Sequence, residues 1–186
     1  MSNLESKDQY FEHGLKTLAA SGFKSLGINA LCSGLGVTSG SFYHHFGSMR
    51  GYTDALLAFW ENRQVLILCD MAFGSGDPDS DIDKLRELTL NLHHEAEVAI
   101  RAWGANDDSV RAVQRRVDDA RRKTVQKAIL GVVGDRKIAK ALTSLGMSML
   151  IGYQQLSAAG HRDDLSVLLD EYVCLIHSRS VIHQRA

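Results

Sequence analysis

The stretch that decides the fold covers residues 22–50 and reads Gly-Phe-Lys-Ser-Leu-Gly-Ile-Asn-Ala-Leu-Cys-Ser-Gly-Leu-Gly-Val-Thr-Ser-Gly-Ser-Phe-Tyr-His-His-Phe-Gly-Ser-Met-Arg. It predicts two short helices, Ile28–Gly34 and Thr38–Phe46, with Gly36 between them to permit a tight turn. Thr38 is a suitable N-cap, because its hydroxyl can accept a hydrogen bond from a free backbone N–H of the second helix. Two helices joined in this way make a helix-turn-helix.

The second of these helices carries small polar and hydrogen-bonding side chains. Leu31, Val37 and Phe42 are expected to pack the two helices together, and Phe46 to close them against a preceding helix at residues 7–21. The remaining face presents Thr38, Ser39, Ser41, Tyr43, His44 and His45, which suits insertion into a DNA major groove. Tyr43 and His44 could instead serve only packing, and for His45 an inward position beside Phe46 is an equal alternative.

These residues resemble the tetracycline-repressor (TetR) family of transcriptional regulators. The resemblance lies in Gly22-Phe23 and in the run Gly36-Val37-Thr38-Ser39-Gly40-Ser41-Phe42-Tyr43-His44-His45-Phe46, and it covers roughly residues 1–50. It implies an operator-binding helix-turn-helix, a helical domain that binds a small-molecule effector, and a homodimer formed through the last two helices. The implied function is that of a repressor that binds a pseudo-palindromic operator and is released by the effector.

The chain departs from the family pattern where cations are usual. Leu26-Gly27 replaces a pair of hydroxyl residues, Ser39 stands where Lys is frequent, and Met49 stands where Lys is nearly invariant; residues 36–48 contain no charged side chain. Each loss removes a potential phosphate contact. We expect Lys24, Arg50 and backbone N–H groups at helix starts to supply that contact. The alternative is a helical ligand-binding or catalytic protein whose helix-turn-helix no longer binds DNA.

The rest of the sequence favours an all-α protein. One proline in 186 residues argues against a turn-rich β fold. After Ser48, the spacing predicts helices at residues 49–72, 81–92, 95–104, 108–132, 136–159 and 163–180.

No apolar run is long enough to span a membrane. The odd cysteine count and absence of a C-x-x-C pair disfavour a disulfide or zinc framework, so a cytoplasmic location is expected. Net charge is −1, and no catalytic arrangement emerges, so no enzyme and no cofactor is expected.

This pattern predicts two domains: a three-helix DNA-binding module at residues 1–48, and a larger effector-binding and dimerisation domain at residues 49–186. The resemblance places the dimer contact on the last two helices. Small residues there would allow close approach, and apolar ones would supply contact; these are Gly146, Gly152, Ala158, Ala159, Leu145, Met149, Leu168 and Tyr172.

A mainly apolar effector is expected among the helices between Met49 and Val132. Aromatic side chains dominate such pockets, and the candidates for lining it are Trp60, Trp103, Tyr153, His93 and His94. Packing of these aromatics in an ordinary core is the alternative. His93 and Glu97 could share a helical face, but two ligands do not make a metal site. The charge run from Arg115 to Lys123 interleaves both signs, which predicts a solvated helix face.

Overall fold

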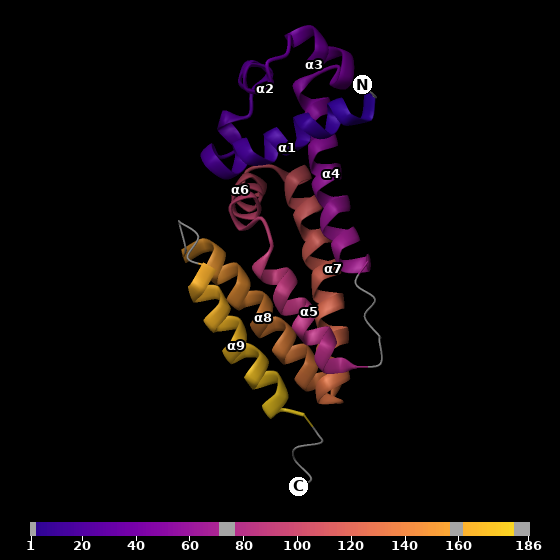
Figure 1. The fold of residues 1–186 in the computed structure, drawn as a ribbon, viewed down its shortest axis with the longest axis vertical. Helices are drawn as coiled ribbons and strands as arrows, with labels where there is room; N and C mark the ends of the chain where they lie inside the picture. Colours follow the sequence, from indigo (N-terminus) through magenta and orange to yellow (C-terminus); the bar gives the residue numbers. More distant parts are fainter. Residues whose placement is uncertain (1–2, 71–76, 157–161, 181–186) are drawn as a thin grey trace. The chain divides into compact units, whose positions relative to one another are not determined.

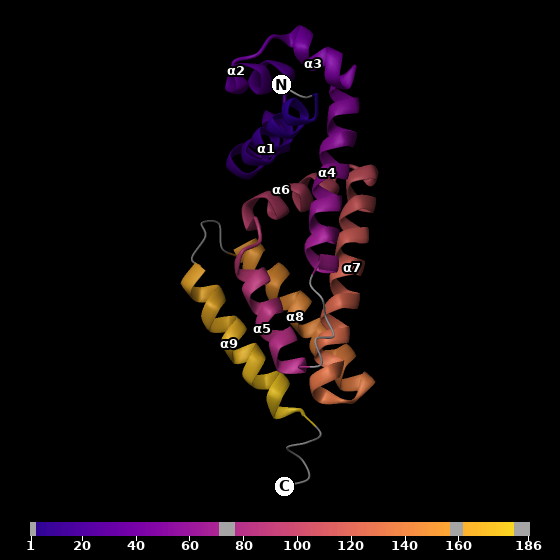
Figure 2. The same ribbon diagram turned by 45° about the vertical axis from the view of Figure 1, so that its right-hand side comes forward.

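The computed structural model describes residues 3–70, 77–156 and 162–180, and within these ranges every long element is an α-helix (Figures 1 and 2). The helices are α1 Asn3–Ser21, α2 Ile28–Leu35, α3 Ser39–Phe46, α4 Met49–Asp70, α5 Pro78–Leu90, α6 His94–Gly104, α7 Asp108–Val133, α8 Arg136–Leu156 and α9 Arg162–Ser178, with a 3-10 turn, η1, at Phe23–Ser25. No described helix is both long and apolar enough to cross a membrane. The all-α prediction is confirmed.

The helix boundaries follow capping signals in the sequence. Thr38 Oγ1 accepts a hydrogen bond from Ser41 N at 3.3 Å, and Ser48 Oγ accepts one from Gly51 N at 3.0 Å. Asp107 Oδ1 caps α7 through Ser109 N, and Asp135 Oδ1 caps α8 through Lys137 N. Each cap satisfies a backbone N–H that lacks a partner in the first helical turn. The Thr38 cap agrees with the prediction.

Two compact units divide the chain: residues 1–64 with 94–117, and residues 65–93 with 118–186. Helices α4 and α7 contribute to both units. The predicted boundary at residue 48 divides the chain by function rather than by compactness, and it stays a prediction.

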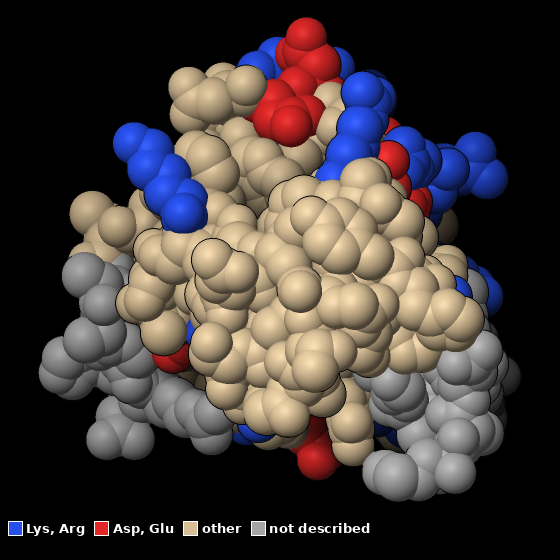
Figure 3. All heavy atoms as spheres, turned by 90° about the horizontal axis from the view of Figure 1, so that it is seen from above, with Lys and Arg blue, Asp and Glu red and all other residues tan. Residues whose placement is uncertain are grey.

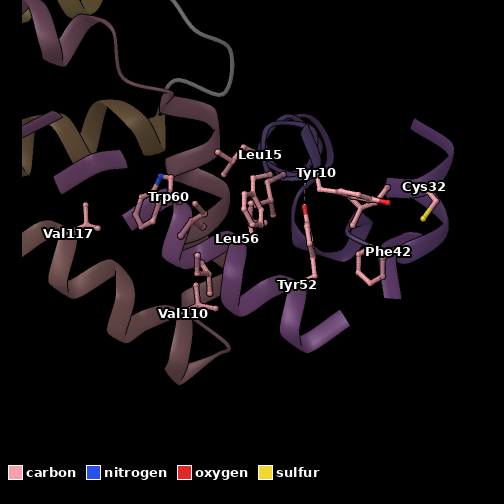
Figure 4. Close-up of a cluster of buried hydrophobic side chains, with 14 residues drawn as sticks. Tyr10, Leu15, Cys32, Phe42, Tyr52, Leu56, Trp60, Val110 and Val117 are labelled. Atoms are coloured by element: carbon pink, nitrogen blue, oxygen red, sulfur yellow. Dashed lines mark hydrogen bonds between the residues drawn. The ribbon is translucent and has the colours of Figure 1, made fainter. Parts of the chain in front are cut away.

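The first unit has one core, built where α1, α2 and α3 pack on the beginning of α4, together with α6 and the beginning of α7 (Figure 4). Its buried members are Tyr10, Phe11, Leu15, Leu18, Leu31, Cys32, Phe42, Tyr52, Leu56, Leu57, Trp60, Ile100, Val110 and Val117. The Tyr52 hydroxyl donates to the Tyr10 carbonyl at 2.9 Å and so joins α4 to α1. Aromatic rings make up much of this core, which suits a small module because each ring buries a large apolar area.

Ion pairs on the surface of the first unit connect the same helices. Arg63 on α4 pairs with Glu12 on α1 at 2.5 Å. Arg116 on α7 donates two hydrogen bonds to the Glu61 carboxylate, at 2.6 and 2.7 Å. These bonds lower the pKa of Glu61. Neighbouring turns of α4 are therefore fixed to both α1 and α7.

In the second unit, α8 and α9 run side by side and α5 packs against α9 (Figures 1 and 2). One cluster includes Ile82, Ile129, Ala139, Leu142 and Ile176, and another is Tyr153, Leu165 and Leu169. Arg86 on α5 bonds Asp170 at 2.6 Å and Ser166 at 2.8 Å on α9. This unit therefore has its own apolar interior.

Two packing expectations are corrected. Val37 is 38% exposed and does not pack α2 on α3, because the left-handed Gly36 turns the chain before it. Arg121, expected on a solvated face of α7, is only 5% exposed. A long arginine stem can be buried while its head keeps polar partners. The alternation of charges along α7 did not distinguish this arginine from its exposed neighbours.

Candidate nucleic-acid interface

The turn between α2 and α3 is held by backbone hydrogen bonds. Gly36 adopts the left-handed conformation, with φ 66° and ψ 31°, which favours glycine. Val37 N donates a hydrogen bond to the Cys32 carbonyl at 3.0 Å. The Cys32 thiol donates one to the Thr38 carbonyl, with 3.7 Å between Sγ and the oxygen. These contacts fix where α3 begins relative to α2.

Phe42 sets the rotation of α3 about its own axis. Its side chain is fully buried, and its ring lies 5.9 Å from that of Tyr10, 5.4 Å from Tyr52 and 5.2 Å from Phe46. Residues on the opposite side of a helix must then face outward. Tyr43 is 52% exposed, and His44 is exposed beside it.

The predicted contact residues divide by exposure. Thr38, Ser39, Tyr43 and His44 are exposed, whereas Ser41 and His45 are half-buried. The hydroxyl of Thr38 also holds the helix cap. The structure therefore brings all six predicted contact residues onto one short helix and its cap; their contact with DNA stays a prediction.

His45 lies between the two predicted positions, one facing outward for DNA contact and the other packed inward beside Phe46. Its ring centroid lies 6.0 Å from that of Tyr10 on α1 and 5.9 Å from that of Phe46. Desolvation is the main reason that the pKa of His45 is lowered, with the charges of His44 and Lys7 adding to it. His45 thus packs toward α1 while part of its ring stays open to solvent.

Cations flank this helix-turn-helix but do not lie within it. No charged residue occurs between Lys24 and Arg50, both of which are exposed. Figure 3 looks onto this end of the first unit: its middle is formed by uncharged residues, and Lys and Arg appear toward the edges. Lys7 is a further cation near this helix, and its Nζ lies 6.0 Å from the centroid of the Phe46 ring. No local sequence signal indicated it, because its place near α3 depends on how α1 packs against that helix.

The predicted effector residues occupy several environments. Trp60 is 1% exposed in the core of the first unit, and its buried Nε1 has no hydrogen-bond partner among the described residues. Trp103 is half-buried and stacks on Phe23, with centroids 6.0 Å apart. His94 begins α6 and is half-buried.

The other two predicted effector residues belong to the second unit. His93 is exposed just before α6, and Tyr153 is 7% exposed beside Leu165 and Leu169. No group of three potential metal-binding side chains lies among the described residues. A ligand role for these residues remains a prediction.

The last two helices expose part of their apolar surface. Leu145 is 48% exposed on α8, and Leu168 is 40% exposed on α9 beside Val167 at 62%. Tyr172, by contrast, already donates to the Leu142 carbonyl at 2.6 Å within the same chain. Gly146 permits this approach, since a Cβ there would lie 2.5 Å from the Tyr172 hydroxyl. Ala158 and Ala159 lie outside the described residues.

Comparison with known proteins agrees with this geometry. Residues 11–56 match the model of the "Bacterial regulatory proteins, tetR family". Among curated proteins, none matches the sequence.

Solved structures match nearly the whole chain. A transcriptional regulator from Rhodococcus sp. Rha1 is 17% identical with a TM-score of 0.76, covering 93% of this chain and 96% of its own. A TetR transcriptional regulator from Legionella pneumophila is 12% identical with a TM-score of 0.75, covering 92% and 97%. A transcriptional regulator from Saccharomonospora viridis, solved with choline, is 18% identical with a TM-score of 0.70, covering 92% and 96%. At these identities the likeness establishes the fold.

Proposed function

Because the chain belongs to the tetR family through the module at residues 11–56, we propose that it is a transcriptional repressor that binds a pseudo-palindromic operator as a homodimer. A small effector then releases it from DNA. A bacterial regulator of this kind acts beside the chromosome, so the cytoplasmic location is part of the proposal.

The main support for the proposal is that α3 is held in one orientation while its predicted contact side chains stay exposed. Buried Phe42 fixes the rotation of the helix, and the Thr38 cap fixes its first turn. Tyr43 and His44 are left exposed, with donors and acceptors at their tips. A recognition helix needs this combination, because base edges are read by side chains held at set positions in the major groove.

Phosphate contact is assigned to the flanking cations. Lys24 and Arg50 are the first cations on either side of residues 25–49 in the sequence, and Lys7 Nζ lies 6.0 Å from the centroid of the Phe46 ring on α3. Backbone N–H groups at the start of α3 add neutral donors. If each copy in a dimer uses these three cations, the logarithm of the affinity should fall with the logarithm of salt concentration with a slope of about −5.

Dimerisation is assigned to α8 and α9. A single helix-turn-helix reaches few base pairs, and two copies normally read half-sites about one DNA turn apart, ~34 Å. The exposed Leu145, Val167 and Leu168 supply apolar surface that a second copy could cover. Tyr172 supports the same interface from inside, because it holds α9 against α8.

The effector site is assigned to the first unit around Trp60. A buried indole N–H without a partner costs roughly 1–3 kcal/mol, so an acceptor from a ligand would stabilise it. Gln64, Glu97 and Gln114 are buried polar residues of the same unit. We therefore expect a mainly apolar molecule with at least one hydrogen-bond acceptor. Trp60 lies on α4, which begins just after α3, so a ligand that shifts α4 would also move α3.

Two experiments test these assignments. In the first, purified protein is mixed with random-sequence duplexes and with the DNA upstream of its own gene, and bound DNA is sequenced. Enrichment of paired half-sites is expected; no enrichment would favour the alternative of a ligand-binding protein without DNA function. In the second, ligands are screened by tryptophan fluorescence, comparing the native protein with Trp60→Phe and Trp103→Phe. An effector bound at Trp60 should lose affinity in the first variant more than in the second.

A further inference from the structure

The helix-turn-helix has an unusual charge pattern that bears on how it holds DNA. From Ser25 to Met49 there is no Lys, Arg, Asp or Glu. Seen from above in Figure 3, the uncharged area forms a broad surface. A protein gains affinity for DNA chiefly by neutralising phosphates with positive charge. Inside this segment, only histidine can become positive in the ordinary pH range.

The two histidines of the segment are adjacent near the end of α3. Their ring centroids lie 5.4 Å apart, with His44 exposed and His45 half-buried. His44 lies next to Tyr43, the most exposed aromatic of the helix at 52%. A phosphate that reaches this side of α3 would therefore find the imidazole of His44 exposed beside the Tyr43 side chain.

The groups packed around this pair decide which histidine can take a proton. Helix α1 contributes Tyr10, whose ring centroid lies 6.0 Å from that of His45, and Lys7, whose charge acts on His45. On α3 itself, the Phe46 ring lies 5.9 Å from that of His45. None of these is acidic. Burial first, then the charges of His44 and Lys7, lower the pKa of His45, which disfavours its protonated form.

We propose that His44 takes up a proton when α3 binds DNA, so that this histidine supplies the positive charge that the segment from Ser25 to Met49 otherwise lacks. The inference rests on the proposed DNA-binding function and adds a regulation to it: affinity for DNA rises as the pH falls. The partner that drives protonation is the phosphate backbone, because a negative charge within about 4–6 Å favours the charged form of an imidazole.

The direction of the effect follows from linkage. A group that is more easily protonated in the complex contributes full affinity at low pH, and that contribution is lost as the pH rises through its pKa in the complex. One unit of difference between the free and bound pKa corresponds to about tenfold in affinity. In a dimer both recognition helices contribute, so the change in the logarithm of the affinity is twice as large.

The test uses the full-length protein and the DNA recovered by sequence enrichment. Affinity is measured by fluorescence anisotropy at pH 6, 7 and 8 and constant ionic strength, for the native protein and for His44→Gln and His44→Lys. His177→Gln is the matched control, because His177 lies in the second unit beside Asp79. Far-UV circular dichroism at each pH checks that every variant is folded.

The native protein and His177→Gln should bind at least about tenfold more tightly at pH 6 than at pH 8. His44→Gln should lose this dependence, and His44→Lys should bind tightly at pH 8 with little dependence on pH. Calorimetry in buffers of different ionisation enthalpy should show proton uptake by the native protein that is absent in His44→Gln. Specific binding that does not change with pH, or a dependence kept by His44→Gln, overturns this inference alone. Absence of DNA binding at every pH overturns the proposed function as well.

Discussion

Gly14 on α1 has a tight contact with α4 that can be tested by adding one methyl group. A Cβ at this position would overlap the Tyr52 hydroxyl and lie 3.2 Å from Tyr52 Cζ and 3.4 Å from Leu56 Cδ2. Tyr52 is fully buried, and its ring is packed against Phe46 at 5.0 Å and Phe42 at 5.4 Å. The tyrosine therefore has no free direction in which to move.

Two effects should make Gly14→Ala lower the free energy of unfolding, and a third partly offsets them. Overpacking in a dense core costs about 1–3 kcal/mol. Displacing the Tyr52 hydroxyl would also weaken its bond to the Tyr10 carbonyl, at about 1 kcal/mol. The higher helix propensity of alanine offsets about 1 kcal/mol. We expect Gly14→Ala to lower the free energy of unfolding by about 1–3 kcal/mol.

Tyr52→Phe provides the matched background, because it removes the oxygen that the new methyl group would strike. It should itself cost about 1 kcal/mol for the lost hydrogen bond, but Gly14→Ala added to it should be nearly neutral. Gly40→Ala in α3 is the control for helix propensity, since a Cβ there would make only an ordinary contact, 3.6 Å from Thr38 Oγ1; it should stabilise by about 0.5–1 kcal/mol.

Urea unfolding followed by circular dichroism at one fixed protein concentration measures all four changes. Stabilisation of the native protein by Gly14→Ala, or an equal cost in both backgrounds, would refute the packing of α1 on α4 described above.

Three further predictions concern the cap, an ion pair and the dimer. Thr38→Ala should destabilise the protein by about 1 kcal/mol in urea unfolding, whereas Thr38→Ser should keep the cap and most of the stability. Glu61→Gln should cost no more than about 1 kcal/mol at pH 7, because its partner Arg116 is largely exposed. Since folding lowers the Glu61 pKa, this difference should be present at neutral pH and disappear as the pH falls through that lowered pKa; a difference that grows in acid would contradict it. Leu145→Glu with Leu168→Glu should give a folded monomer in sedimentation at micromolar concentration, and an unchanged dimer would exclude this surface.

The helix-turn-helix could be predicted from the sequence because its signals are local. A glycine that must adopt positive φ, a threonine cap and a phenylalanine on the buried side each act within a few residues of α3. Together they leave little choice for the turn. For the same reason, most helix boundaries after Ser48 agree with the prediction to within a few residues.

The prediction differs from the structure at single positions for two kinds of reason. Local signals set the start of α5 at Pro78 rather than at residue 81, because Asp77 caps it and proline suits its first turn, whereas the hydrophobic spacing begins only later. Val37 is apolar like a core residue, yet the left-handed turn at Gly36 leaves it 38% exposed. Burial of Arg121 depends on neighbours that the repeating pattern of α7 does not contain.

The candidate site was predicted in part. Periodicity identified the face of α3 that presents Tyr43 and His44, because Phe42 must point inward. It could not locate Lys7, which reaches the same end of the module from α1. The effector residues were chosen by composition, and composition does not distinguish Trp60 from Tyr153. Trp60 is fully buried, and its N–H has no partner among the residues that the structure describes, whereas Tyr153 packs in the other unit.

The central claim is that α3 reads DNA, and affinity for the enriched operator measures it most directly. The native protein is compared with Tyr43→Ala combined with His44→Ala by anisotropy titration at one pH and one salt concentration, with circular dichroism and sedimentation confirming the fold and assembly of both. Our account predicts that the double variant loses specific binding while keeping its helix content and its oligomeric state. Specific affinity unchanged within about twofold, a difference of less than 0.5 kcal/mol, would contradict it.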